Sequence, residues 1–522
     1  MLSLLALLFF IRPAGAAEAV VNLAGKEISL GEQLNASSVG RLPASRVYQY
    51  VLAGSVRGTG LLADTVPPGT SFEDLAASAG GTLPLSGEVT NATGRLPFSV
   101  VDETFTQDVP VSVPVIGTVM VTVTIKLKGA VQANGVVQFS FLATAVPKDF
   151  PIGLPTPDGS IVFEAGSKLT VSSLFDSLGG EFIGAVEADP LQSGHQGIAK
   201  IKVTAGGLMT GSLQFQGGKF KIKTGIGANL QSSLVKLGTT GATAQFIAEA
   251  ENLDEITMEI VRPGATTIVA TLQRITFAAG PPTFRAGSYT IALVPPPLGV
   301  GETAANRPVG HGYLVATITV TGNILLVGQL CDGKPLTCAS ALLPDETFPF
   351  YAPTAGGAGS IFGTLAMQNE TVADDLNGEL RWTKPATPAD RVFKEEFDLA
   401  LTARGSRYLK PLPGQRALAL MGGEVSLNGG NLVSPLLSLF TLSQRNVITL
   451  FEPVGLKLKA VTAKGLVQGT YKADARSKAL SVRGVLRQKH NAASGFFIGN
   501  PGAGTPVESG LFELFEPAPP LE

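Results

Sequence analysis

The sequence has few of the residues that most often carry catalysis or bind metals. Its 522 residues include only 2 Cys, 3 His and 1 Trp. Nucleophilic hydrolysis needs a serine or cysteine beside a base, yet His195, His311 and His490 are scattered among turns and no Gly-x-Ser-x-Gly motif occurs. Zinc motifs are also absent. These absences predict no cofactor and leave enzyme activity undecided, with a non-enzymatic role favoured.

Charge is also scarce and evenly balanced. Charged residues make up 15% of the chain, against ~25% in an average soluble domain. The 39 basic and 41 acidic residues give a net charge of −2, and no Lys/Arg block stands out. Nucleic-acid binding depends on a basic footprint, and seven Tyr with one Trp offer few stacking surfaces. We therefore exclude nucleic acid as a partner.

Only one long apolar run is present, at residues 1–11. Arg12-Pro13 ends it, and Ala14-Gly15-Ala16 suits signal cleavage. The run is too short to span a bilayer as a helix, so a membrane partner is not expected. The sequence therefore predicts a signal peptide over residues 1–17 and a secreted, cell-surface or periplasmic protein.

The two cysteines, Cys331 and Cys338, flank an Asp-Gly turn in CDGKPLTC. In an oxidising compartment they can close a hairpin as a disulfide. They can equally be free thiols on strands that do not face each other. Both readings remain open from the sequence.

The sequence is instead rich in glycine and contains stretches in which apolar and polar residues alternate. The chain holds 62 Gly, and apolar and polar residues alternate from Val119 to Lys128, a period of two typical of a half-buried strand. Asn134-Gly135 then predicts a tight hairpin. We expect an all-β protein. Residues 18–94 are predicted to be weakly structured, with a short helix around 72–79, and residues 95–185 form a small immunoglobulin-like β-sandwich.

A nine-residue segment nearly recurs, as VTAGGLMTG at 203–211 and VTAKGLVQG at 461–469. A weaker copy places Val320 eight residues before Gly328. Glycines within strand patterns favour curved sheets. Residues 190–515 are therefore predicted to form a large antiparallel β-barrel or barrel-like region of related repeats, which can divide into 190–300 and 305–515. The Leu-Lys alternation before the last copy is one residue out of phase, which suggests a bulge.

A series of motifs follows in a fixed order over residues 190–500, including RAGSYTIALVPPP, GHGYLVATITVTGNILLVGQLCDGK, DDLNGELRWTKP, FDLALTARGSRY and VRGVLRQKHNAASGFFIG. In the order of these motifs the chain resembles a β-rich repeat domain of large secreted or surface proteins of environmental bacteria. In such relatives the turn holding Cys331 usually begins with alanine, so a disulfide is not implied. The resemblance implies architecture and export, and no activity.

Acidic clusters are the remaining candidates for chemistry. The first can bind calcium through oxygen ligands, although its spacing is irregular, and comprises Asp374, Asp375, Asn377 and Glu379. A glycosidase needs only two acids on a cleft wall, and a second cluster adds Glu395, Glu396 and Asp398. The simplest interpretation of both clusters is solvated turns and strand ends.

Exposed aromatic rings would favour sugar binding, and the candidate platform residues are Tyr351, Trp382 and Tyr408. Trp382 follows Leu380 by two residues, which places it on the core face instead.

The favoured function is an exported, non-enzymatic structural or adhesive protein. The alternatives are a polysaccharide-binding or glycosidase-like protein and, second, an outer-membrane β-barrel, whose aromatic girdles this sequence does not readily supply. Expected partners are polysaccharides or other surface proteins.

Overall fold

The computed structural model describes residues 18–516, apart from 43, 46, 61, 79–81, 84, 92, 94, 114–116, 149–158, 174–177, 188–195, 228, 240, 250–251, 278–281, 370–372, 452–454 and 475. The predicted signal peptide and His195 therefore lie outside the described residues. The all-β prediction is confirmed, because strands dominate and the one α-helix described is α1, Phe72–Ser78. No helix in the described ranges has the length and hydropathy needed to cross a membrane.

The N-terminal unit, residues 18–173, packs three four-stranded sheets around one core. The first sheet has the strand order β1 (Glu18–Asn22), β12 (Lys168–Ser173), β4 (Val47–Ala53), β7 (Ser86–Thr90). The second has the order β3 (Gln33–Ser37), β10 (Val137–Pro147), β9 (Gly117–Val131), β8 (Phe98–Val113). The third has the order β2 (Glu27–Ser29), β11 (Gly159–Phe163), β5 (Ser55–Gly60), β6 (Thr70–Ser71).

Residues 18–94, expected to be weakly structured, instead supply strands β1–β7 to this unit. β1 and β4 pair with β12, β3 pairs with β10, and β2 and β5 pair with β11. These short strands depend on partners distant in the sequence, which their local composition does not reveal. Two local predictions are confirmed. Helix α1 begins where Ser71 Oγ accepts from the backbone N–H of Asp74 at 3.0 Å, and Gly135, at φ 80°, turns β9 into β10.

Three antiparallel eight-stranded sheets follow, which we call the first, second and third barrels. The first consists of β13 Gly180–Glu187, β14 Gln196–Val203, β15 Leu208–Phe215, β16 Gly218–Gly225, β17 Val235–Lys236, β18 Thr243–Glu249, β19 Asn252–Val261 and β20 Ile268–Arg274. The second consists of β21 Gly287–Val294, β22 Gly312–Ile318, β23 Asn323–Gln329, β24 Pro335–Ala341, β25 Thr347–Thr354, β26 Gly359–Met367, β27 Leu376–Lys384 and β28 Phe397–Tyr408, with the 3-10 turn η1 Ala355–Gly357. The third consists of β29 Gly422–Gly429, β30 Leu436–Leu442, β31 Ile448–Leu450, β32 Leu456–Val461, β33 Leu466–Tyr471, β34 Leu480–Arg487, η2 Gln488–His490, β35 Ala492–Ile498 and β36 Ser509–Phe515.

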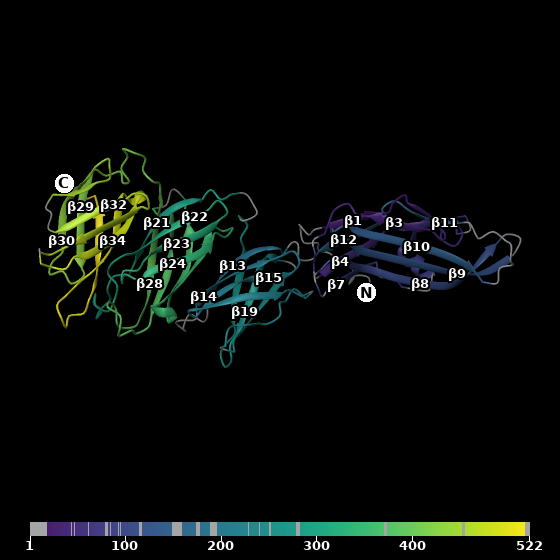
Figure 1. Ribbon diagram of the computed structural model, residues 1–522, viewed down its shortest axis with the longest axis horizontal. Coiled ribbons are helices and arrows are strands. Elements are labelled where there is room, and N and C mark those ends of the chain that lie inside the picture. The colour runs from purple at the N-terminus through teal and green to yellow at the C-terminus, as the bar shows by residue number, and fades with distance from the viewer. Residues whose placement is uncertain are drawn as a thin grey trace.

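Each barrel is a nearly closed meander in which the first strand pairs with the last. The pairing is interrupted between β16 and β17, between β24 and β25, and between β31 and β32. Figure 1 shows the N-terminal unit and the three barrels following one another along the long axis of the molecule. The predicted barrel-like repeats are therefore confirmed. The boundaries differ from those expected, because β13, within the predicted sandwich, pairs with β14 and β20 of the first barrel.

The repeated hairpin explains the phase shift in the sequence. In the first barrel Val203 pairs with Met209, which leaves five loop residues, whereas in the third Val461 pairs with Leu466, which leaves four. The loop that is one residue shorter, rather than a bulge, offsets the one-residue shift in the sequence. The lysines of β32 therefore point to the outer face, as those of β14 do. Lys202 lies opposite Thr210, and Lys459 lies opposite Gln468.

The predicted second copy is misaligned. Val320 lies in a turn with 58% of its surface exposed, rather than at the end of a strand. Thr319 bonds to Asn323 as Thr204 bonds to Leu208, so Ile318 occupies the place of Val203. The Val320–Gly328 spacing is therefore coincidental, although β22 and β23 do correspond to β14 and β15 by their position in the meander.

The second and third barrels share an interface. Val485 and Phe496 of the third barrel belong to the apolar core of the second. Thr290 on β21 donates to the carbonyl oxygen of Leu486 at 2.5 Å, and a parallel bridge joins Val392 to Val507. Buried apolar contacts and matched polar groups together fix how these two barrels meet.

His311 sits within this interface, with its backbone N–H bonded to the carbonyl oxygen of Gly495 at 3.0 Å. Burial, followed by the positive charges of Arg487 and Arg404, lowers the pKa of His311 from 6.5 to about 4. Between about pH 4 and pH 6.5, the imidazole of His311 is protonated in the unfolded chain and neutral in the folded chain. The contribution of neutral His311 to stability is therefore complete above about pH 6.5 and is lost as the pH falls toward 4.

We expect this histidine alone to lower the free energy of unfolding of the joined barrels by roughly 2–3 kcal/mol across that pH range. His311→Gln cannot take up the proton, so its unfolding temperature should depend less on pH. Calorimetric unfolding of both proteins at several pH values between 4 and 7 provides the measurement. Identical pH dependence in the two proteins would contradict the assignment.

Candidate functional site

Two acids of the first acidic cluster have partners at the junction of the second and third barrels. Asp374 is 7% exposed, with Oδ1 2.6 Å from Nε2 of His490 and Oδ2 3.2 Å from Nε of Arg404. Asp375 accepts from Nζ of Lys489 at 2.7 Å. Asp374 therefore joins the barrels through a hydrogen bond with His490, and Asp375 does so through an ion pair with Lys489.

The rest of the cluster does not converge on them. The side-chain oxygen of Asn377 accepts from Gln368 at 2.8 Å, and Glu379 is exposed on β27 opposite Thr364 and Thr402. Within the described ranges, no group of three His, Cys, Asp or Glu residues is placed to hold a metal ion. The calcium hypothesis therefore finds no assembled ligand set in that part of the chain.

The second acidic cluster contributes two side chains to one cavity. Glu396 and Asp398 line a space of 420 Å³ together with Arg307 and Lys384. Nε of Arg381 lies 2.8 and 3.0 Å from the two carboxylate oxygens of Asp398, so both oxygens accept a hydrogen bond from this arginine. Phe397 between the two acids is only 5% exposed. The cavity therefore brings two acids together, one of them held by Arg381, and the aromatic residue that lines it is buried.

The three aromatic candidates are buried, so none is a sugar platform. Trp382 is 1% exposed and packs edge-to-face on Phe397 with ring centroids 4.9 Å apart, which confirms its predicted place in the core. The two tyrosines connect neighbouring barrels. The hydroxyl of Tyr351 accepts from the backbone N–H of Gly217 at 3.2 Å, and that of Tyr408 donates to the carbonyl oxygen of Thr462 at 2.6 Å.

Cys331 and Cys338 are both buried free thiols, so they do not form the disulfide considered above. Cys338 lies opposite Leu326, five residues before Cys331 along the chain. At about 3.3 Å per residue, this offset of roughly 16 Å far exceeds the ~4.4–6.8 Å between the Cα atoms of a disulfide. Burial raises the pKa of both thiols, that of Cys338 to about 11.

A different feature emerges around Arg483, where three cavities of 260, 400 and 570 Å³ share lining residues. The first and third are lined by the second and third barrels, and the 400 Å³ cavity is lined by the third barrel alone. Arg483 on β34 lines all three, Ser481 lines the first two, and Gln329 on β23 lines the first and third. We call these three cavities together the cationic cleft. Its basic lining residues are Arg391, Lys457, Lys459, Lys464, Lys478 and Arg483, and none of the described residues that line the three cavities is Asp or Glu.

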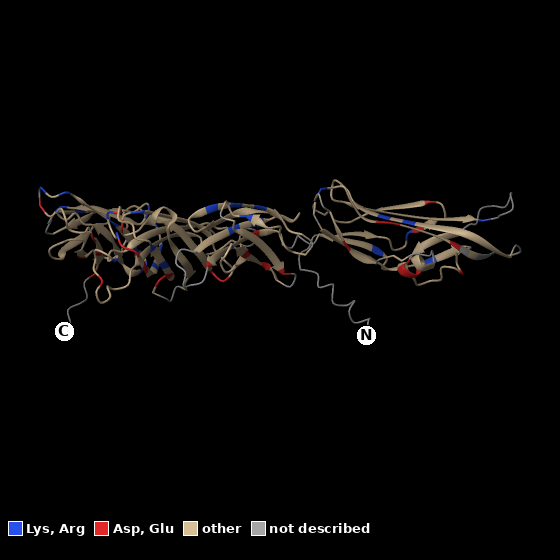
Figure 2. Ribbon diagram, turned by 90° about the horizontal axis from the view of Figure 1, so that it is seen from below, with Lys and Arg blue, Asp and Glu red and all other residues tan. Residues whose placement is uncertain are grey.

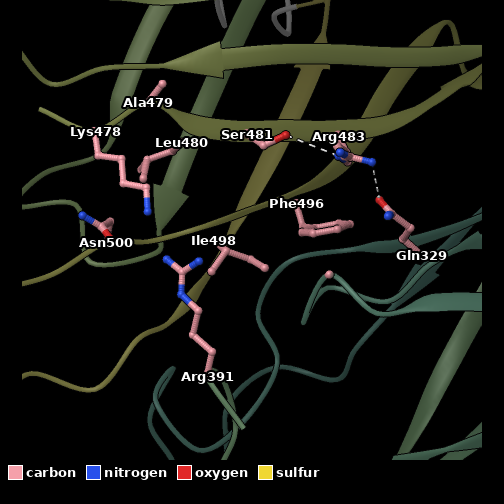
Figure 3. A pocket seen from close by; sticks show the side chains of 11 residues that line it. Gln329, Arg391, Lys478, Ala479, Leu480, Ser481, Arg483, Phe496, Ile498 and Asn500 are labelled. Carbon is pink, nitrogen blue, oxygen red and sulfur yellow. Dashed lines mark hydrogen bonds between the residues drawn. The ribbon is translucent and has the colours of Figure 1, made fainter.

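The smallest cavity shows how these cations are held (Figure 3). Arg483 donates to Gln329 Oε1 at 3.1 Å and to Ser481 Oγ at 3.3 Å, which fixes its guanidinium between the barrels. Arg391 donates to the carbonyl oxygen of Gly499 at 3.0 Å. In Figure 3 the side chains of Arg391 and Lys478 extend toward the same space. Within the described residues, none of the six cleft cations forms an ion pair with a carboxylate.

The largest cavity adds an apolar wall to this charged lining. Leu325 and Val327 on β23 are 50% and 48% exposed, and Leu466 on β33 lies on the opposite side. Hydroxyl and amide groups of Ser288, Thr317 and Gln329 accompany them. The three cavities therefore offer cations, hydrogen-bonding groups and apolar carbon surface around Arg483.

Comparison with known proteins adds little to this geometry. No protein-family model matches the chain, and no curated protein matches it. Solved structures of transferrin binding protein B give weak likenesses. A double mutant from Haemophilus parasuis Hp5 is 11% identical, covering 95% of this chain and 98% of that one with a TM-score of 0.18. The protein from Neisseria meningitidis serogroup B is also 11% identical, covering 90% and 99% with a TM-score of 0.18. Such scores are too low to carry an argument about this protein.

Proposed function

We propose that this is an exported, non-enzymatic binding protein of the cell surface or extracellular space, and that its cationic cleft holds an anionic polysaccharide. The observation that carries the proposal is the gathering of six cations in three cavities that share Arg483, with no carboxylate among the described lining residues. With a net charge of −2, the chain has no general excess of basic residues to explain this concentration.

The shape and lining of the cleft favour a polymer of acidic sugars. Three cavities that share Arg483 suit an extended chain better than a single small anion. Guanidinium groups bind carboxylates and sulfates through paired hydrogen bonds, while serine, threonine and glutamine side chains suit sugar hydroxyls. The exposed Leu325 and Val327 can pack against the apolar faces of sugar rings. A single-stranded nucleic acid would instead use exposed aromatic stacking surfaces, and the lining aromatic rings Tyr313, Tyr408 and Phe496 are 7%, 5% and 2% exposed.

Binding to a polysaccharide panel tests the proposal. We expect the mature protein to bind polygalacturonate or heparin, and not neutral dextran, in surface plasmon resonance. Because exposed charges are screened within about 8 Å at physiological ionic strength and about 3 Å at 1 M, affinity should fall steeply between 0.05 and 1 M NaCl. Equal binding to dextran, or salt-independent binding, would contradict the ligand class. Release of reducing sugar during the incubation would contradict the non-enzymatic role.

A further inference from the structure

The outer face of the first barrel carries a second concentration of positive charge. Lys200 and Lys202 on β14 and Lys219, Lys221 and Lys223 on β16 flank the central strand β15. We call these five residues the lysine face. It belongs to a different barrel from the cationic cleft and shares no residue with it.

Strand pairing arranges the lysine face in regular rows. Thr210 lies between Lys202 and Lys223, and Ser212 lies between Lys200 and Lys221. Neighbouring strands are about 4.8 Å apart and alternate residues about 7 Å apart, so the two lysine columns stand about 10 Å apart with hydroxyl groups between them. The face is a flat grid of cations and hydrogen-bonding groups.

The lysines of β16 are the free part of this grid. Lys219, Lys221 and Lys223 are exposed and, among the described residues, have no carboxylate within ion-pair distance. On β14 the charge is partly offset, because Glu181 lies 3.3 Å from Lys200 and 3.9 Å from Lys202. Figure 2 shows basic residues gathered on one side of the first barrel and acidic residues on the other.

The third barrel repeats the same arrangement within the cationic cleft. Thr470 lies between Lys457 and Ser481, and Gln468 lies between Lys459 and Arg483. Two hairpins of related sequence thus place cations on both sides of a polar central strand, despite their different loop lengths. The repetition indicates that the rows are a property of this hairpin rather than an accident of one surface.

We infer that the lysine face is a second binding surface for an anionic polysaccharide, separate from the cleft. The inference takes its ligand class from the proposed function, although the surface does not depend on the cleft. Charge complementarity sets the sign of the ligand, and the row of Thr210, Ser212 and Gln214 offers partners for sugar hydroxyls. Among the described residues of β14, β15 and β16, Leu208, at 38% exposure, is the one exposed large apolar side chain. A single leucine is little apolar surface to insert into a lipid layer, which favours a polysaccharide over a membrane. Two sites on one chain would bind a long polymer more tightly than either site alone.

Calorimetric titration with a heparin-derived hexasaccharide tests the inference. The wild-type protein should bind two hexasaccharides. The face variant K219Q/K221Q/K223Q should retain only the cleft site, and its affinity for full-length heparin should fall roughly tenfold, as expected for three surface cations. K219R/K221R/K223R should bind as the wild type does. K126Q/K128Q/K168Q removes the same charge from the N-terminal unit, and it should also retain both sites.

Each outcome separates the two proposals. One hexasaccharide per wild-type chain, lost in the face variant, would support the lysine face and contradict the cleft. Two sites retained in the correctly folded face variant would overturn this inference and leave the cleft intact. Binding of the wild type, and not of the face variant, to phosphatidylglycerol vesicles without hexasaccharide binding would overturn the polysaccharide assignment in favour of a membrane. Circular dichroism of all variants confirms their folding.

Discussion

Replacing Trp382 with alanine should lower the free energy of unfolding of the second barrel by about 3–5 kcal/mol. The indole is 1% exposed and packs edge-to-face against Phe393 and Phe397, with ring centroids 6.3 and 4.9 Å away. Truncation would leave a large cavity among these rings, and core packing relaxes only partly around such cavities. Chemical denaturation followed by circular dichroism measures the loss, since the variant lacks the only tryptophan.

Trp382→Phe is the matched control. Phenylalanine leaves a smaller cavity and removes the indole Nε1, which is buried without a hydrogen-bond partner in the described part of the chain. Its loss should therefore be roughly 1–2 kcal/mol. Folded Trp382→Ala protein should still bind heparin with wild-type affinity. Unchanged stability with lost heparin binding would instead restore Trp382 as a sugar platform.

Replacing Arg483 with serine should weaken binding of an acidic hexasaccharide at the cleft by roughly 10- to 150-fold. Arg483 is the one cation common to all three cavities. Hydrogen bonds to charged groups contribute about 1.5–3 kcal/mol each, which corresponds to that range of affinity. The measurement uses K219Q/K221Q/K223Q as the parent protein, so that binding at the lysine face does not mask the change.

Two variants make this prediction specific. Arg445→Ser removes an exposed arginine from a turn of the same barrel and should leave affinity unchanged. Arg483→Lys keeps the charge and loses the paired geometry of the guanidinium. Its affinity for the hexasaccharide should therefore lie between those of the serine variant and of the parent protein with Arg483. Equal affinities for arginine and serine at this position would mean that the cleft does not bind the acidic groups.

Much of the architecture can be read from the sequence because it depends on local patterns. Alternation from Val119 to Lys128 marks β9, and Asn134-Gly135 marks the turn into β10. The near repeat at 203–211 and 461–469 marks two hairpins with the same outer rows. Period-two patterning and turn chemistry require no knowledge of distant partners.

The sites depend on partners that local patterns do not specify. Asp374 forms a hydrogen bond with His490, which lies 116 residues away in the sequence, and Arg483 forms one with Gln329, 154 residues away. Tyr351 and Tyr408 look like exposed aromatics in the sequence, yet each closes an interface between barrels. The lysine alternations are visible in the sequence. That one of them shares a cavity with Arg483, which reaches Gln329 of the second barrel, depends on how complete barrels pack.

A crystal structure of the protein with an acidic hexasaccharide bound tests the central claim most directly. The account predicts an ordered sugar chain in the cationic cleft, with its carboxylates or sulfates within hydrogen-bonding distance of Arg483 and at least one neighbouring cation, Arg391 or Lys478. An empty cleft in crystals that hold the sugar elsewhere would contradict it. So would a sugar that contacts only the apolar wall of Leu325 and Val327.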